Sequence, residues 1–119
     1  MNLQKTYTSL LTGDLAAAER WYGNLLGRGP DSRPMATLVQ WESSGGGGLM
    51  LSDNDEIASR GAAFFYVADI EVERERLRSL GIMLGDDIEG DYSRLAQVSD
   101  PDGNLLTLAT PPRRPFPAA

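Results

Sequence analysis

The sequence predicts an α+β fold built from two tandem modules, each with a strand, a helix and further strands. Short β-rich runs alternate polar and apolar side chains, whereas two longer segments repeat apolar residues at helical spacing. The landmarks of the first half recur about 55 residues later, as Asp14 and Asp69 do. A chain of 119 residues with 41% hydrophobic composition is long enough for one ordinary domain.

The first half is predicted to contain one capped helix. The carboxylate of Asp14 can accept a backbone N–H bond one turn on, apolar residues follow at helical spacing, and Gly27 is the expected end. The strands of this half are predicted at residues 6–11, 36–42 and 49–51, with a loop at 29–34 and a hairpin around the glycines at 45–48.

The second half repeats this order. Asp69 takes the capping position, residues 72–80 form a charged amphipathic helix with Leu77 and Leu80 inward, and Gly81 ends it. The strands are predicted at residues 62–67, 92–98 and 105–109, the last two joined by a turn at 100–103. We therefore expect a single domain over residues 1–110, with modules at about 1–57 and 58–110.

The last residues, 111–119, form a proline-rich tail. Proline has no N–H to give to a neighbouring strand, so this tail cannot continue a central strand. We expect it to be extended over the surface or disordered.

Composition excludes several classes of function. The chain has no histidine and no cysteine, and so lacks the commonest zinc ligands, the usual neutral-pH general base and any disulfide. A net charge of −6 opposes nucleic-acid binding and favours neutral or cationic small partners. No stretch approaches the ~20 apolar residues of a membrane span, and no signal peptide is evident at the N-terminus, so we expect a cytoplasmic protein.

Three segments carry a resemblance to a known family. They are Tyr7-Thr8-Ser9-Leu10-Leu11-Thr12-Gly13-Asp14-Leu15, Arg20-Trp21-Tyr22 followed by Leu25-Leu26-Gly27, and Asp100-Pro101-Asp102-Gly103-Asn104. In these the chain resembles the glyoxalase/bleomycin-resistance/extradiol-dioxygenase superfamily, also called vicinal oxygen chelate proteins. The resemblance implies two tandem βαβββ modules whose curved mixed sheets surround a cleft, within one chain or across a homodimer.

The resemblance also implies where a metal would be held, because enzymes of the family place ligands on the first and last strands of each module. Those positions carry Tyr7, Met50, Ala63 and Thr107 here. Thioether sulfur prefers soft Cu(I), neutral hydroxyls are weak donors, and alanine has no donor. The sequence therefore resembles a metal-free branch of the family, and we expect no metal and no cofactor.

Without a metal, the cleft itself is the candidate site. Strand parity, taken from the ligand positions, predicts that Tyr7, Ser9, Ala63, Phe65 and Thr107 face it. Met50 belongs to the same set, and Trp41 adds a surface for stacking on a flat ring. Tyr7 and Phe65 are more typical of a hydrophobic core than of a contact surface, and Trp41 is compatible with either.

Three functions are compatible with these residues. The first is a small-molecule binding protein that sequesters an aromatic or cationic compound, as in the antibiotic-resistance branch of the family. The second is a metal-free isomerase or lyase with Glu42 as base and Tyr7 as hydrogen-bond donor. The third is a non-catalytic regulatory subunit.

Overall fold

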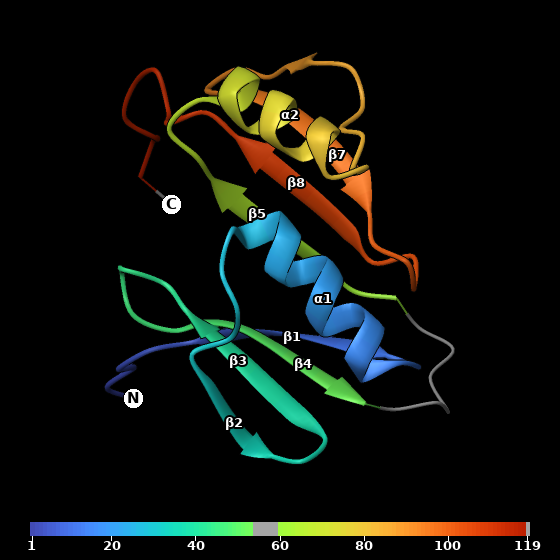
Figure 1. Cartoon of the computed structure of the whole chain (residues 1–119). Coiled ribbons are helices and arrows are strands. Elements are labelled where there is room, and N and C mark those ends of the chain that lie inside the picture. The colour runs from blue at the N-terminus through green and yellow to red at the C-terminus, as the bar shows by residue number, and fades with distance from the viewer. Residues whose placement is uncertain (54–59, 119) are drawn as a thin grey trace. The chain divides into compact units, whose positions relative to one another are not determined.

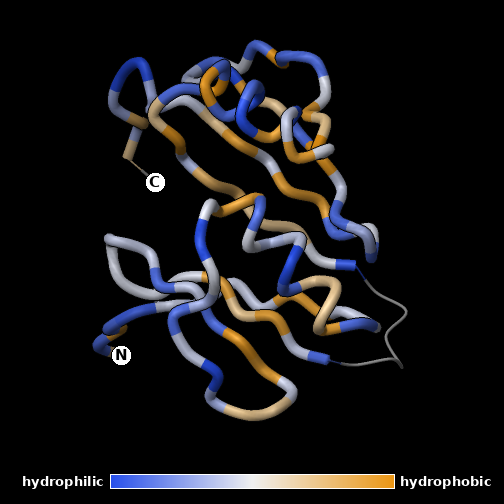
Figure 2. The backbone as a smooth tube through the Cα atoms, viewed as in Figure 1, coloured by the Kyte–Doolittle hydropathy of each residue, from blue (hydrophilic) through white to orange (hydrophobic). Residues whose placement is uncertain are grey.

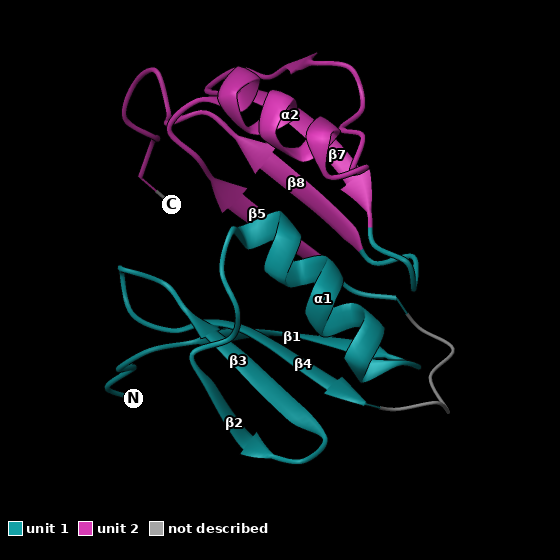
Figure 3. Cartoon of the chain, in the orientation of Figure 1, with its two compact units in different colours: residues 1–61, 100–104 teal, residues 62–99, 105–119 magenta. Residues whose placement is uncertain are grey.

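The chain forms two compact units in a computed structural model that describes residues 1–53 and 60–118 (Figure 3). Unit 1 comprises Met1–Gly61 and Asp100–Asn104, and unit 2 comprises Ala62–Ser99 and Leu105–Ala119. The turn 100–104 connects two strands of unit 2 but itself belongs to unit 1.

Unit 1 contains one helix and a four-stranded mixed sheet (Figure 1). Its elements are β1 (Tyr7–Thr12), α1 (Leu15–Leu26), β2 (Ser32–Met35), β3 (Leu38–Glu42) and β4 (Gly48–Asp53). The strand order is β1-β4-β3-β2, with β1 parallel to β4 and the other pairs antiparallel.

Unit 2 repeats this topology (Figure 1). Its elements are β5 (Ala62–Tyr66), α2 (Ile70–Ser79), β6 (Ile88–Glu89), β7 (Arg94–Ser99) and β8 (Leu105–Ala109). The strand order is β5-β8-β7-β6, with β5 parallel to β8. The predicted α+β fold of two tandem βαβββ modules is confirmed.

Each unit has one short edge strand that the sequence did not predict. Strand β2 overlaps the segment 29–34 expected as a loop and contains Pro34, and β6 is only two residues long. Both are the last strand of their sheet. Proline is tolerated on an edge strand because one side of that strand needs no ladder hydrogen bond.

The two helices begin with matching caps, as the internal repeat predicts. Asp14 and Asp69 both have extended backbones, and their carboxylates accept hydrogen bonds from the N–H groups of Ala17 and Val72. Gly27 and Gly81 follow the helices with φ of 82° and 80°, a left-handed conformation that favours glycine. One correction concerns Leu80, which is exposed because α2 ends at Ser79 and leaves it on the cap.

The core of unit 1 lies between α1 and one face of its sheet. The sheet contributes Leu10, Val39, Trp41, Leu49 and Leu51, and the helix contributes Leu15, Ala18, Tyr22 and Leu25, all buried. Helix α1 contacts the central strand β4. Each fully buried large apolar side chain contributes roughly 1.5–3 kcal/mol to folding.

The core of unit 2 follows the same alternation. Buried residues of the sheet are Ala63, Ala96, Leu106 and Leu108, and α2 adds Ile70 and Leu77. Figure 2 shows the hydrophobic residues concentrated along the strands and helices, with mostly hydrophilic connecting loops.

The turn 100–104 is held by a buried carboxylate. Asp100 accepts hydrogen bonds from the hydroxyl of Tyr22 at 2.6 Å, the side-chain amide of Asn104 at 2.8 Å, and the N–H groups of Asp102 and Asn104 at 2.9 and 2.8 Å. Asp102 in turn accepts from the hydroxyl of Thr12 at 2.7 Å. This motif, one of the three segments that carry the resemblance, therefore holds unit 1 together through buried and part-buried hydrogen bonds.

No helix in the described part of the chain has the length and apolar character needed to cross a membrane.

Candidate functional site

The face of the first sheet opposite its core carries three of the predicted site residues. Pairing of β1 with β4 matches Ser9 with Met50, and Tyr7 lies two residues before Ser9 on the same face. These side chains are half-buried or exposed, in contrast to the buried residues that alternate with them. Tyr7, Ser9 and Met50 therefore lie on one face of the sheet, and ligand binding by them stays a prediction.

Tyr7 and Glu42 meet across this face. The hydroxyl of Tyr7 donates to both carboxylate oxygens of Glu42, at 2.7 and 2.9 Å. The two residues lie on β1 and β3, and both are in register with Gly48 of the intervening strand β4. Because Gly48 has no side chain, the tyrosine and the carboxylate can reach each other over it.

Close backbone packing also requires glycine in the turn before β4. A Cβ on Gly47 would lie 1.7 Å from the carbonyl oxygen of Thr6, and one on Gly48 would lie 1.9 Å from that of Trp41. Gly47 has φ of 78°, and its carbonyl accepts a 2.7 Å hydrogen bond from the N–H of Ser43. The glycine run therefore builds a tight hairpin turn that fixes the position of β4 beside Tyr7.

Trp41 does not belong to this face. It is in register with Leu49, only 2% exposed, and its indole N–H donates to the carbonyl oxygen of Arg28 at 2.9 Å. The prediction of an open stacking surface on Trp41 is wrong. Alternation along β3, with polar Gln40 and Glu42 on the other face, carried the signal that Trp41 points inward.

The predicted grouping in the second sheet is wrong by one residue. Ala63 is in register with Leu106, and Phe65 with Leu108, on the face that forms the core of unit 2. Thr107 is in register with Phe64 and so lies on the opposite face. Side chains alternate along a strand with a period of two, so a shift of one residue exchanges the faces.

The face that carries Thr107 holds two aromatic side chains that the sequence did not single out. Phe64 and Tyr66 are 51% and 54% exposed, and their rings pack edge to face with centroids 5.3 Å apart. Thr107 is buried beside them, and its hydroxyl accepts a 3.1 Å hydrogen bond from Gln97. Large apolar rings exposed together in this way are typical of a binding surface.

These rings line a pocket of about 170 Å³ within unit 2. Its lining residues are Phe64, Tyr66, Gly90, Asp91, Tyr92, Ser93, Leu95 and Phe116. The rings of Tyr92 and Phe116 pack with centroids 4.7 Å apart, which gives the pocket a second aromatic pair. A cavity of ~150 Å³ can take up a benzene ring, so this one suits a single aromatic ring.

Of two acidic residues at or beside the pocket, Glu89 has arginine partners and Asp91 has none among the described residues. Glu89, just before it, accepts hydrogen bonds from Arg94 and Arg113, and first the Arg94 bond and then Arg113 hold the pKa of Glu89 below its usual value. Asp91 lines the pocket and forms no ion pair within residues 1–53 and 60–118. An uncompensated carboxylate therefore stands at the edge of four aromatic rings.

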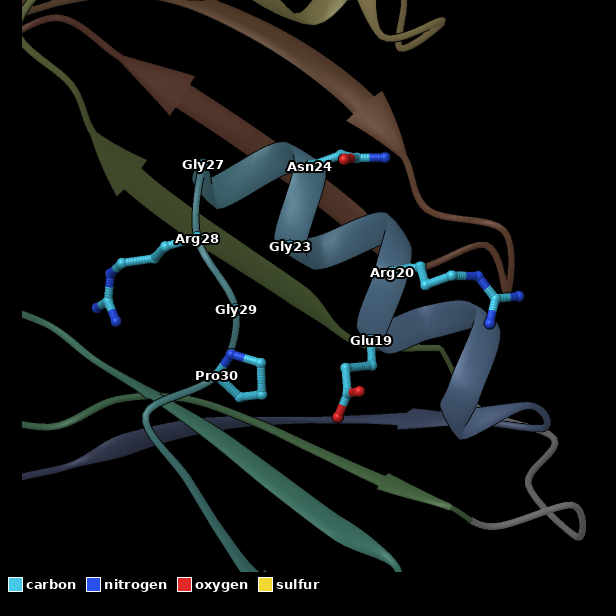
Figure 4. A pocket seen from close by; sticks show the side chains of 8 residues that line it. All are labelled: Glu19, Arg20, Gly23, Asn24, Gly27, Arg28, Gly29 and Pro30. Carbon is cyan, nitrogen blue, oxygen red and sulfur yellow. The ribbon is translucent and has the colours of Figure 1, made fainter.

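A larger hollow of about 450 Å³ lies in unit 1 between α1 and the loop that follows it. Figure 4 shows its two arginines, Arg20 and Arg28, pointing away from each other. Arg28 is bound to Asp31 and to the carbonyl oxygen of Glu42, and Glu19 is paired with Arg33. Its charged groups are therefore spread apart or already paired, and they do not converge on a ligand.

The residues at the family's metal positions do not fit a divalent ion. Tyr7 donates its hydroxyl proton to Glu42, Met50 offers a thioether, and Ala63 is turned into the core. Within the described ranges 1–53 and 60–118, no three acidic side chains come together as metal ligands. The donor set thus supplies one carboxylate, Glu42, where hard cations need several oxygens.

The fold is the one seen in solved structures of glyoxalase/bleomycin resistance/dioxygenase proteins, so the resemblance seen in the sequence is confirmed at the level of the fold. The chain aligns with a glyoxalase/bleomycin resistance protein from Catenulispora acidiphila at 24% identity and a TM-score of 0.80, over 91% of this chain and 98% of that one.

Two further solved structures are similar. Lactoylglutathione lyase from Agrobacterium tumefaciens aligns at 22% identity and a TM-score of 0.73, over 90% of this chain and 92% of that one. Oxidase ChaP-H2 aligns at 23% identity and a TM-score of 0.76, over 98% and 97%. No protein-family model matches the sequence, and no curated protein matches it significantly.

Proposed function

We propose that this protein binds a small aromatic cation without the help of a metal, at the aromatic pocket of its second sheet. The single observation that carries the proposal is the exposed edge-to-face pair of Phe64 and Tyr66 in a pocket the size of one ring. The similar solved structures are a glyoxalase/bleomycin resistance protein, a lyase and an oxidase. The shared fold therefore does not distinguish a binding protein from an enzyme, and the function has to be inferred from the site.

The pocket's walls favour a flat ring. Aromatic pairs with ring centroids 4.5–7 Å apart gain about 0.5–1.5 kcal/mol beyond simple burial. Four rings, from Phe64, Tyr66, Tyr92 and Phe116, can contribute contacts of this kind. The polar groups nearby are few, which is typical of small-molecule sites.

Charge favours a cation. The pocket carboxylate of Asp91 lacks an ion-pair partner among the described residues, and a positive ligand would supply one. Aromatic faces add to this, since a cation over a ring gains about 0.5–1 kcal/mol at exposed sites. The net charge of −6 acts in the same direction at longer range.

Thermal unfolding with a ligand panel tests the proposal. The panel contains basic aromatic antibiotics, benzyltrimethylammonium as a minimal aromatic cation, and benzoate as an anion of similar size. A ligand at 100 times its dissociation constant should stabilise the fold by about 2.7 kcal/mol. We expect the cations to raise the unfolding midpoint and benzoate to leave it unchanged.

Matched variants locate the site. Phe64→Ala should weaken binding of the cations about threefold to tenfold, whereas Met83→Ala, which shortens another exposed apolar side chain of unit 2, should not. Asp91→Asn should reduce the preference for cations over neutral analogues, with Asp86→Asn as the control for net charge. A panel without any stabilising cation would overturn the proposal.

A second function is favoured by the contact between Tyr7 and Glu42. Glu42 is a half-buried carboxylate beside the phenol of Tyr7. In this arrangement Glu42 would take a proton from a carbon of the substrate, and Tyr7 would donate its hydroxyl hydrogen bond to the oxyanion that develops on the substrate. The protein would then act as a metal-free isomerase or lyase.

Exchange of the carbon-bound protons of hydroxyacetone with deuterated solvent tests this second function, and Glu42→Gln should abolish the exchange. Absence of exchange with the unaltered protein would rule out this second function for such ketones.

Assembly is part of the same proposal. The family resemblance implies that the protein forms a homodimer. It also implies that the binding partner is a small ligand and not nucleic acid or a membrane. Analytical ultracentrifugation with and without benzyltrimethylammonium measures the assembly state, and a monomer at all concentrations would contradict the dimer.

A further inference from the structure

The tail after β8 is folded back onto the aromatic pocket. Thr110 donates its N–H to the carbonyl oxygen of Arg94 at 3.0 Å, and the N–H of Arg113 donates to that of Tyr92 at 2.8 Å. The tail bends at Arg113 and Arg114 and follows the surface of unit 2.

Arg113 anchors this segment with its side chain as well. Its guanidinium donates to the carbonyl oxygen of Gly90 at 3.0 Å and to the carboxylate of Glu89 at 2.8 Å. Both partners belong to the segment immediately before Tyr92, so one arginine fixes the tail at the rim of the pocket. Prolines at 111, 112, 115 and 117 restrict the backbone on either side of this anchor.

Two tail residues then contact Tyr92. The ring of Phe116 lies 4.7 Å from that of Tyr92 and lines the pocket, and the guanidinium of Arg114 lies 4.4 Å from the Tyr92 centroid. Phe116 is nevertheless 55% exposed. A large apolar side chain held this way has area left to cover, and a ligand ring in the pocket would cover it.

We infer that the tail forms one wall of the binding site, in which Phe116 contacts the ligand and Arg113 positions Phe116. This inference rests on the proposed function and adds the residues that determine retention of the ligand. The ligand ring would enter between the sheet-borne pair, Phe64 and Tyr66, and the ring of Phe116. The wall has no helix or ladder of its own, and the backbone and side chain of Arg113 supply the hydrogen bonds that anchor it beside its ring contacts with Tyr92.

Titration of the full chain with benzyltrimethylammonium, followed by calorimetry, tests the inference. Phe116→Ala should weaken binding about threefold to tenfold, and Phe116→Tyr, which keeps the ring, should restore most of it. Arg113→Ala should weaken binding similarly, and Arg78→Ala, which removes an exposed arginine of α2 paired with Glu75, should have no effect.

The double variant separates positioning from general structure. If Arg113 acts through Phe116, the combined Arg113→Ala and Phe116→Ala change should weaken binding no more than Phe116→Ala alone. Unaltered binding by Phe116→Ala, while the unchanged chain binds, would overturn the tail's role and leave the proposed function intact. Tighter binding by Phe116→Ala would overturn it too, because Phe116 would then compete with the ligand. If the unchanged chain binds no cation, the proposed function fails and this inference fails with it.

Discussion

The hydroxyl of Tyr22 donates a 2.6 Å hydrogen bond to the carboxylate of Asp100, and both groups are buried. The bond joins α1 to a turn that lies 78 residues further along the chain. A buried carboxylate is tolerated here because four donors satisfy it. The charge on Asp100 is therefore part of what holds the turn 100–104 to α1 within unit 1.

Removing this bond should destabilise the protein. Tyr22→Phe leaves the ring in place but removes a hydrogen bond to a charged group, which costs about 1.5–3 kcal/mol. Urea unfolding measures the loss, with Tyr66→Phe, at a tyrosine that is 54% exposed, as the control. A loss no greater than that of the control would contradict the role assigned to this bond.

Asp100→Asn should be at least as harmful. An amide keeps the shape of the carboxylate but turns an NH₂ group toward donors, so at least one buried donor is left without an acceptor, at about 1–3 kcal/mol or more. The same urea experiment tests it. Asp86→Asn, at an exposed position, is the matched control.

Stability should fall at alkaline pH through Tyr22. Burial first, and then the bond and charge of Asp100, raise the pKa of Tyr22 far above its ordinary value of 10.0. The folded state keeps this proton while the unfolded chain loses it, so the stabilisation is complete below about pH 10. Above that pH the free energy of unfolding should decrease by about 1.4 kcal/mol per pH unit. Between pH 9 and 11, Tyr22→Phe should show a shallower decline than the unaltered protein, and parallel declines would contradict this.

The hairpin turn before β4 should not tolerate a side chain. Gly48→Ala would place a Cβ against the carbonyl oxygen of Trp41, and relief requires movement of the backbone. We expect a loss of at least about 2 kcal/mol in the free energy of unfolding. Gly45→Ala, in the same glycine run with no atom within 4 Å of the added Cβ, should change stability by less than about 0.5 kcal/mol.

Chelation should leave the protein unchanged. The family's metal positions offer a phenol, a thioether, a methyl group and a buried hydroxyl, which are poor donors for hard and borderline ions. We expect the unfolding midpoint to be the same with EDTA as without it, and added Zn²⁺, Ni²⁺ or Mn²⁺ not to raise it. Elemental analysis that finds a stoichiometric metal after chelation would contradict this expectation.

Much of the fold could be predicted because local signals coincide with tertiary structure. Aspartate favours the start of a helix because its carboxylate accepts a backbone N–H bond, and glycine favours the end because it adopts positive φ. Asp14, Asp69 and Gly27 occupy those positions here. The edge strands β2 and β6 could not be predicted in this way. They are short, and β2 contains a proline that favours a loop until a neighbouring strand supplies the pairing.

The site was harder to predict than the fold. Strand β5 has the sequence Ala-Ala-Phe-Phe-Tyr, which is apolar on both faces, so alternation cannot tell which face is turned to the core. The register with β8 decides that Phe64 and Tyr66 are open and Phe65 is not. Tyr92 and Phe116 lie 24 residues apart, and no local pattern links them.

The sequence by itself determined the two modules, their helix caps and the absence of histidine and cysteine, because these depend on residue type and short-range geometry. Tertiary structure alone decided that Tyr7 meets Glu42 over Gly48 and that four rings surround one pocket. The physical reason is that strand register and a folded-back tail bring distant side chains together, and a shift of one residue in a strand reverses which of them are exposed.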